Sequence, residues 1–398
     1  MGNPNYLVPM SSPDINDEDR AAVLDVLRTS YLSMGPKVDG FEKAVARYTG
    51  VKHALGVSSG TAGLHLCVRA AGIQPGDYVI TTPFSFVSST NVLLFENAVP
   101  VFVDVDPKTG NIDPEKVRQA TADLKSGDEQ RTAKWLPRKG STKDGKLKAL
   151  LAVDVFGQPA DYDKLEAIAR DYKLVLIEDS CEAIGAEFKH RKAGTFGDFG
   201  VFAFYPNKQM TTGEGGMLVT NDSKAADLMR ALRNQGRAPA DNWLQHTHLG
   251  YNYRLDEMSA ALGLSQMQRI DELINKRETV AQWYNKYLKD IEGTEIPYVS
   301  PDTTRMSWFV YVIRIDQRFN RDRTAAKLDA AGIPVRPYFL PIHLQPYMVE
   351  RFGYQKGDFP ITEDLGERSL ALPFSGVMTE DQVKLVCTTL KECLCKSF

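Results

Sequence analysis

The sequence is short of cysteine, of long apolar runs and of net charge, and each shortage excludes a class of protein. Its 398 residues include five cysteines, an odd and scattered set that argues against a disulfide framework. No uninterrupted apolar run approaches the ~18 residues that a membrane-spanning helix needs. The 48 basic and 51 acidic residues give a formal net charge of −3, which favours neither nucleic acid nor an anionic membrane as a partner.

The N-terminus also lacks the features of a secretory signal. Its first residues, MGNPNY, have no basic start and no apolar core, so we expect a cytoplasmic protein with reduced thiols. The Cys393-x-Cys395 pair has no histidine nearby, and we therefore expect no metal site. The remaining composition, 43% hydrophobic and 25% charged, is that of an ordinary globular protein and excludes wholesale disorder.

Short apolar runs alternate with amphipathic helical patterns through the first half of the chain. This alternation predicts an α/β domain with a mostly parallel sheet that is covered by helices on both faces. We assign residues 1–255 to this large domain. A helical pattern over residues 255–292 follows, and residues 256–398 form a long linking helix and a smaller C-terminal α+β domain. The predicted strands of the large domain lie near residues 54–57, 78–80, 101–103, 150–153, 174–177 and 201–204.

Residues 125–148 are unusual in composition. They contain eight lysines or arginines and three acidic residues, with almost no apolar periodicity. A basic stretch of this kind is compatible with a nucleic-acid-binding arm, but the balanced charge of the whole chain does not favour that function. We interpret the segment as a surface insertion.

Three chemically distinct groups follow three of the predicted strands. Residues 54–57 lead into Ser58-Ser59-Gly60-Thr61 and a helix, residues 174–177 into Glu178 and Asp179, and residues 201–204 into a loop with Lys208. Ligands of open α/β sheets bind at the carboxyl ends of the strands. We therefore expect a helix N-terminus, a carboxylate and a lysine to meet at one edge of the sheet.

Each group alone has an ordinary explanation, as a helix cap, a solvated acid or a surface lysine. Together they match the needs of pyridoxal phosphate. A helix N-terminus suits its phosphate, a carboxylate keeps its ring nitrogen protonated, and a lysine forms the Schiff base and carries protons. The glycines that follow Lys208 allow the backbone to approach a ligand closely.

Several motifs then resemble the DegT/DnrJ/EryC1/StrS family of sugar aminotransferases, which are fold-type I pyridoxal-phosphate enzymes. The resemblance covers nearly the whole chain. It is carried by FYPNKQ at residues 204–209, TGEGG at 212–216, LGYNYR at 249–254 and IHLQP at 342–346. It implies a large domain with a mostly parallel seven-stranded sheet and a smaller C-terminal α+β domain.

The resemblance also implies the roles of individual residues. Lys208 is expected to form the Schiff base, Asp179 to bind the ring nitrogen, and Gly60 and Thr61 to hold the phosphate. Phe86, within PFSFV at residues 83–87, matches the aromatic residue that stacks on the ring.

Two further residues are placed by the same resemblance. Glu182 lies where relatives have His or Gln against the other ring face. Asn252 is expected to reach the phosphate bound to the neighbouring subunit, so that the active sites are shared across a homodimer. The substrates implied are L-glutamate and a nucleotide-linked keto-deoxysugar, with pyridoxamine phosphate as the cofactor's intermediate form and surface-polysaccharide or glycan amino sugars as the destination.

The sequence departs from the family pattern at two positions. Ala203 stands where many relatives have a serine that donates to the phosphate, so one hydrogen bond is missing or supplied otherwise. Glu182 makes the chain resemble members that act on 4-keto sugars, such as perosamine synthases, more than 3-keto enzymes.

Two other functions remain as alternatives. A sugar dehydratase of the same fold carries histidine at the lysine position, which Lys208 argues against. A regulatory homologue without turnover would not need the set of Asp179, Lys208 and Thr61. Arg336 and His343 lie in a proline-rich segment near the expected pocket mouth, where substrate contact and structural packing remain equally open.

Overall fold

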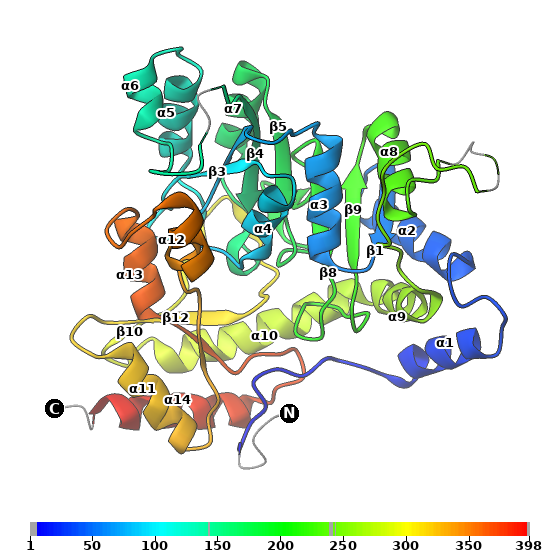
Figure 1. The fold of residues 1–398 in the computed structure, drawn as a ribbon. Coiled ribbons are helices and arrows are strands. Elements are labelled where there is room, and N and C mark those ends of the chain that lie inside the picture. Colours follow the sequence, from blue (N-terminus) through cyan, green and yellow to red (C-terminus); the bar gives the residue numbers. More distant parts are fainter. Residues whose placement is uncertain (1–5, 142–143, 239–241, 243, 396–398) are drawn as a thin grey trace.

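The central element of the fold is a seven-stranded sheet in the order β1-β9-β8-β5-β4-β2-β3 (Figure 1). The computed structural model describes residues 6–141, 144–238, 242 and 244–395. The seven strands are β1 (His53–Val57), β2 (Tyr78–Thr81), β3 (Val99–Phe102), β4 (Leu147–Val153), β5 (Val175–Asp179), β8 (Phe199–Ala203) and β9 (Gly216–Thr220).

Six of the seven strands run in the same direction. β3, β2, β4, β5 and β8 pair in parallel, whereas β9 is antiparallel to both β8 and β1. The predicted mostly parallel sheet is therefore confirmed. The sequence analysis missed β9, which follows the loop after β8 and pairs with β8 directly, as an antiparallel neighbour can without a helical crossover.

Helices cover both faces of this sheet, as the alternation of side chains along each strand requires. Ile177 of β5 and Val201 of β8 face one hydrophobic cluster, and Leu176 and Phe202 face clusters on the opposite side. The first face is covered by α3 (Gly60–Ala70), α4 (Ser88–Phe95) and α8 (Ser223–Arg233). The second is covered by α2 (Pro36–Thr49), α5 (Pro114–Leu124), α7 (Tyr162–Tyr172) and α9 (Glu257–Gln268).

A second, four-stranded antiparallel sheet has the order β10-β12-β14-β13. Its strands are β10 (Thr294–Glu295), β12 (Tyr311–Ile315), β13 (Arg336–Pro337) and β14 (Ser369–Leu372), and it packs with α11 (Arg321–Ala330) and α14 (Glu380–Cys395). A three-stranded sheet comprises β6 (Glu187–Phe188), β7 (Arg191–Lys192) and β11 (Thr303–Arg305). The remaining elements are α1 (Asp17–Leu27), α6 (Glu129–Ala133), α12 (Pro346–Phe352), α13 (Pro360–Arg368) and the 3-10 turns η1 (Val155–Gly157) and η2 (Ile342–Leu344).

The helix α10 (Ile270–Leu288) connects the two sheets (Figure 1). Its first turns, with Leu273 and Ile274, pack in the cluster beneath the large sheet. Its later turns, with Val280 and Tyr284, pack in the cluster of the four-stranded sheet. One helix therefore contributes to both hydrophobic cores.

The single long helix expected over residues 255–292 is in fact two helices. α9 and α10 meet at Arg269, whose backbone leaves the helical region at φ −123° and ψ 22°. The Arg269 guanidinium donates to the backbone and side chain of Asp14 and to the buried Asp19 carboxylate. These hydrogen bonds to the N-terminal segment stabilise the break.

Most of the basic stretch at residues 125–148 is a surface segment that is attached to α12 and the loop after it, whereas its last two residues, Leu147 and Lys148, begin β4 of the central sheet. Its first part contains the exposed helix α6. Arg138 then donates to both oxygens of Asp358 at 2.6 and 2.7 Å, and the Lys139 N–H donates to the Phe352 carbonyl. Residues 142–143 of the stretch lie outside the described residues. Across the described ranges, no helix combines the length and apolar content needed to cross a bilayer.

Candidate active site

A cavity of about 450 Å³ lies at the carboxyl ends of the parallel strands. It is lined by the start of α3, by the ends of β4, β5 and β8, and by two segments from the C-terminal part of the chain. The expectation that three strand ends converge on one edge of the sheet is confirmed. Its lining includes Ser59, Gly60, Thr61, Phe86, Asp179, Glu182 and Lys208.

The N-terminus of α3 forms one wall of the cavity. Ser59 caps the helix, because its Oγ accepts a hydrogen bond from the Ala62 N–H at 3.1 Å. A Cβ atom on Gly60 would lie 2.7 Å from Cys181 Sγ and 2.8 Å from Ala203 Cβ, so only glycine fits here. The unpaired N–H groups and the dipole of this helix end make it a suitable seat for an anion.

Asp179 is the last residue of β5 and supplies a buried carboxylate. Its Oδ1 accepts a hydrogen bond from the Cys181 N–H at 3.2 Å. Burial raises the pKa of Asp179, while the hydrogen bond from Cys181 and the charge of Lys208 act in the opposite direction. A cationic group placed beside this carboxylate would keep it ionised.

Lys208 extends from the loop after β8 into the same cavity. Its Nζ lies 3.6 Å from Glu182 Oε1 and 3.7 Å from the centre of the Phe309 ring. The amine thus lies between a carboxylate and the face of an aromatic ring, and both groups shield it from bulk solvent.

Glu182 is held by hydrogen bonds to both its side chain and its main chain. Its Oε2 accepts a hydrogen bond from the Phe156 N–H at 2.9 Å, and its own carbonyl accepts one from Gln209 Nε2 at 2.5 Å. Burial raises the pKa of Glu182, and the Lys208 charge and the Phe156 N–H oppose this effect. Phe156 itself adopts a left-handed conformation at φ 60°, which aims its N–H at the carboxylate.

Two of the expected site residues, Phe86 and Asn252, are exposed on the surface of the single chain. Phe86 lines the cavity, but 61% of its surface is exposed. Asn252 does not line the cavity of its own chain; it is exposed and forms a β-bridge with Asn234.

Ala203, where the family resemblance predicts a serine, also lines the cavity. Hydroxyl groups from Ser59, Thr61, Ser85 and Ser88 line the same cavity and offer other donors for an anion.

The sequence analysis missed residues that the tertiary structure brings to the cavity. Phe309, Tyr338 and Phe339 come from the four-stranded-sheet region, and no periodicity near them signals a cavity. Other lining residues were given no role from the sequence: Tyr205, Asn207, Glu214 and Gly215 lie within the quoted motifs, and Val153 and Cys181 lie outside them.

His343 contributes to structural packing and does not contact the cavity. It is fully buried, and its ring Nε2 lies 2.9 Å from Glu363 Oε1, away from the residues that line the cavity. Arg336 is exposed and donates to the Val335 carbonyl, and it does not line the cavity either.

The residues of the cavity fit pyridoxal phosphate. A helix N-terminus, a buried carboxylate and a lysine amine reach one cavity from three strand ends, and Gly60 lets the helix start pack closely against Cys181 and Ala203. Ser59, Gly60 and Thr61 could hold the phosphate, Asp179 the ring nitrogen and Lys208 the aldehyde carbon.

Comparison with known proteins gives a consistent result. The model of the DegT/DnrJ/EryC1/StrS aminotransferase family matches residues 13–391. The chain is 36% identical to the GDP-perosamine synthase of Caulobacter vibrioides over 97% of this chain and 98% of that protein. It is 35% identical to the spore coat polysaccharide biosynthesis protein SpsC of Bacillus subtilis, over 98% and 97%. The structure of Helicobacter pylori PseC, an aminotransferase involved in pseudoaminic acid biosynthesis, superposes with a TM-score of 0.86 at 28% identity, covering 98% and 100%.

Proposed function

Because the chain belongs to the DegT/DnrJ/EryC1/StrS aminotransferase family, we propose that it transfers an amino group from L-glutamate to a nucleotide-linked keto-deoxysugar with pyridoxal phosphate as cofactor. The observation that carries this proposal is the single cavity that contains Gly60, Asp179 and Lys208. No two of these residues are close in sequence, and the chemistry of this cofactor uses all three.

Each residue has a definite task in this mechanism. When bound, the cofactor withdraws electrons from the carbon that loses a proton, which protein side chains cannot do. Lys208 removes that proton and returns it to the second carbon, because its flexible amine can reach both positions. Asp179 holds a proton on the ring nitrogen, and the N-terminus of α3 binds the phosphate.

Phe86 and Glu182 contact the two faces of the cofactor ring in this proposal. Glu182 also accepts from the Phe156 N–H, so its carboxylate is oriented before any ligand binds. The Glu182 carboxylate lies 3.6 Å from the Lys208 amine and orients it within the cavity.

The acceptor proposed is a 4-keto rather than a 3-keto sugar. Support comes from Glu182, the variant that resembles perosamine synthases, and from the 36% identity to a GDP-perosamine synthase. The similarity to SpsC supports surface-polysaccharide synthesis as the destination of the amino sugar.

The active unit proposed is a homodimer with shared sites. Tyr251 and Tyr253 flank Asn252, and their rings lie 4.7 and 5.9 Å from the ring of His65 on α3. Alternate side chains of an extended segment point to opposite sides, so Asn252 points away from its own chain. This exposure, together with that of Phe86, supports contact between Asn252 and the phosphate in a partner's cavity.

The test is a product assay. Purified protein with pyridoxal phosphate and L-glutamate is incubated with UDP-, GDP- and dTDP-linked 4-keto and 3-keto sugars, and amino-sugar products are identified by mass spectrometry. We expect one 4-keto sugar to be aminated, with 2-oxoglutarate formed in equal amount.

Other products would indicate the alternative functions. A deoxygenated sugar without nitrogen would identify a dehydratase. If no sugar and no amino donor changes the cofactor spectrum, the protein is a regulatory homologue and the proposal is wrong.

A further inference from the structure

A buried arginine from α10 lies directly behind the lysine of the candidate site. Arg277 exposes only 3% of its surface. Its Nη2 donates to the carbonyl oxygens of Lys208 at 2.5 Å and Asn207 at 3.1 Å. Its Nη1 donates to the carbonyl oxygens of Trp308 and Phe309, each at 3.1 Å. One guanidinium therefore joins two backbone segments that are about a hundred residues apart.

Both of these segments contribute a group to the environment of the lysine amine. The first carries Lys208 itself. The second carries Phe309, whose ring centre lies 3.7 Å from Lys208 Nζ. The relative position of the two backbone segments decides whether the Phe309 ring covers the Lys208 amine. Arg277 donates a hydrogen bond to the carbonyl of each of these two residues.

The second segment has a backbone conformation that needs support. Trp308 is left-handed at φ 51°, which non-glycine residues rarely adopt. α10 holds it at two successive positions. Arg277 binds the Trp308 carbonyl, and Glu278 Oε2 accepts from the Trp308 indole N–H at 2.5 Å.

The four hydrogen bonds of Arg277 all end on main-chain carbonyls rather than on a carboxylate. Burial lowers the pKa of Arg277 to about 10, so the group is charged at neutral pH. A buried charge without close ionic compensation is costly to stability, and a neutral residue could fill this space at lower cost. Only the planar fork of arginine reaches four carbonyls at once.

We infer that Arg277 is a positioning residue for the amino-transfer reaction, which fixes Lys208 relative to Phe309 and so holds the amine between the Phe309 ring and the Glu182 carboxylate. This inference rests on the proposed function of Lys208. Arg277 touches neither the cavity nor a substrate, and it acts through the two backbone segments that it joins.

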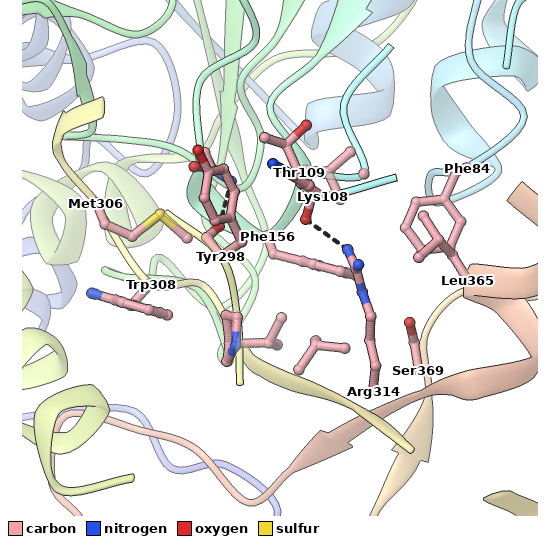
Figure 2. Close-up of a pocket in the computed structure, with 16 residues that line it drawn as sticks. Phe84, Lys108, Thr109, Phe156, Tyr298, Met306, Trp308, Arg314, Leu365 and Ser369 are labelled. Atoms are coloured by element: carbon pink, nitrogen blue, oxygen red, sulfur yellow. Dashed lines mark hydrogen bonds between the residues drawn. The ribbon is translucent and has the colours of Figure 1, made fainter. Parts of the chain in front are cut away.

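The test compares Arg277→Lys with a matched control, Arg314→Lys. Arg314 of β12 also donates to main-chain carbonyls of one distant segment, those of Pro107 and Lys108. It lies beside the small cavity of about 30 Å³ drawn in Figure 2, and its Nη2 donates to the Lys108 carbonyl at 2.7 Å. Both changes keep the positive charge and replace a guanidinium that donates to main-chain carbonyls. Only Arg277 donates to the carbonyl of Lys208.

For the enzyme loaded with pyridoxal phosphate we expect Arg277→Lys to lower kcat about tenfold or more, with KM for glutamate within about threefold. We also expect the pH midpoint of the absorbance of the lysine-bound cofactor to shift by roughly half a pH unit or more, because the surroundings of the amine change. Arg314→Lys should lower the Tm and leave both kcat and the spectral midpoint unchanged.

A second variant keeps the test decisive if Arg277→Lys does not fold. Phe309→Leu retains the Phe309 carbonyl and all four Arg277 hydrogen bonds but removes the ring over the amine, and it should shift the same spectral midpoint. The inference is overturned if Arg277→Lys or Phe309→Leu titrates like the wild type, or if Arg314→Lys shows the same shift. A wild-type enzyme without Lys208-dependent absorbance would overturn the proposed function as well, so the two failures can be told apart.

Discussion

The proposed chemistry depends on Lys208, whose amine has two close neighbours, a carboxylate and an aromatic ring. Glu182 Oε1 lies 3.6 Å from Lys208 Nζ, and the centre of the Phe309 ring lies 3.7 Å from it. The carboxylate and the ring face both attract a cation. They would therefore hold the amine at this place in the cavity when it is not bound to the cofactor.

At the residue scale, Lys208→Ala should abolish turnover. The variant has no amine to link to the cofactor or to carry the proton, so the yellow protein-bound absorbance should disappear. Affinity for pyridoxamine phosphate should persist, because that form needs no bond to lysine.

Absorbance spectroscopy and calorimetric titration check these outcomes. Lys192→Ala is the control, since Lys192 pairs with Glu187 at 3.2 Å and does not line the cavity. Activity of Lys208→Ala near the wild-type rate would contradict the mechanism.

Asp179→Asn should retain the cofactor but lower kcat about a hundredfold or more, which corresponds to ~2.7 kcal/mol in the barrier. The amide keeps the size of the side chain and loses the charge that holds the ring nitrogen's proton. Single-turnover kinetics with glutamate measure the proton-transfer step directly. An unchanged rate would show that Asp179 does not face the ring nitrogen.

At the scale of elements, a buried carboxylate ties the ends of two strands together. Asp154 follows β4, and its backbone N–H donates to the Asp179 carbonyl at the end of β5. Its Oδ2 accepts from Ser180 Oγ at 2.6 Å, and its Oδ1 accepts from the Tyr162 hydroxyl and the Ala160 N–H at 2.7 and 3.0 Å. The loops on both sides of the cavity are thereby fixed.

Asp154 should make the protein less stable as the pH rises. Burial raises the pKa of Asp154 from 3.8 to about 7. Between these values the folded state holds a proton that the unfolded state has lost, so the free energy of unfolding falls by up to about 1.4 kcal/mol per pH unit. The loss begins near the unfolded pKa and ends near the folded one.

Asp154→Asn should remove this part of the slope. The amide oxygen can accept from Tyr162 and Ala160, and the amide NH2 can donate to Ser180 Oγ once the Ser180 hydroxyl turns to accept. Urea unfolding at pH 5, 6, 7 and 8 at one protein concentration measures the change. A residual slope is expected, because burial also raises the pKa of Glu178, to about 8. An unaltered pH dependence in the variant would show that Asp154 is ionised in the folded protein.

At the scale of the whole molecule, the cavity combines both parts of the chain. Phe309, Tyr338 and Phe339 line it from the side of the four-stranded sheet, and the remaining lining residues lie at the edge of the large sheet. α10 packs into both cores and fixes this arrangement. The division into domains at residues 255 and 256 stays a prediction.

Mixed dimers test whether the site is shared. Lys208→Ala disables the pocket of its own chain. Asn252→Asp should empty the partner's pocket, because a carboxylate repels the phosphate. In a mixed dimer both changes fall in one pocket and the other pocket is intact. Random exchange makes half of the dimers mixed, so about one quarter of the wild-type activity should return, a count that follows from two-fold symmetry.

The measurement is the activity of the two inactive variants after they are denatured and refolded together. Wild-type protein that survives the same treatment is the control. If Asn252 acts only within its own chain, the mixture stays inactive and the shared site is refuted.

The sequence by itself determined the fold class and the main parts of the site. The periodicity of apolar residues depends only on near neighbours in the sequence, so the apolar strands and the helices between them could be recognised. Because parallel strands end at the same edge of a sheet, their order then placed Gly60, Asp179 and Lys208 at one edge.

The tertiary structure alone decided the contacts between segments that are far apart in the chain. It brought Phe309 over Lys208, placed the Arg277 guanidinium behind both, divided the expected long helix at Arg269, and buried His343 away from the cavity. These outcomes depend on how side chains pack between distant elements, and hydrophobic periodicity and motif spacing contain no information about such packing.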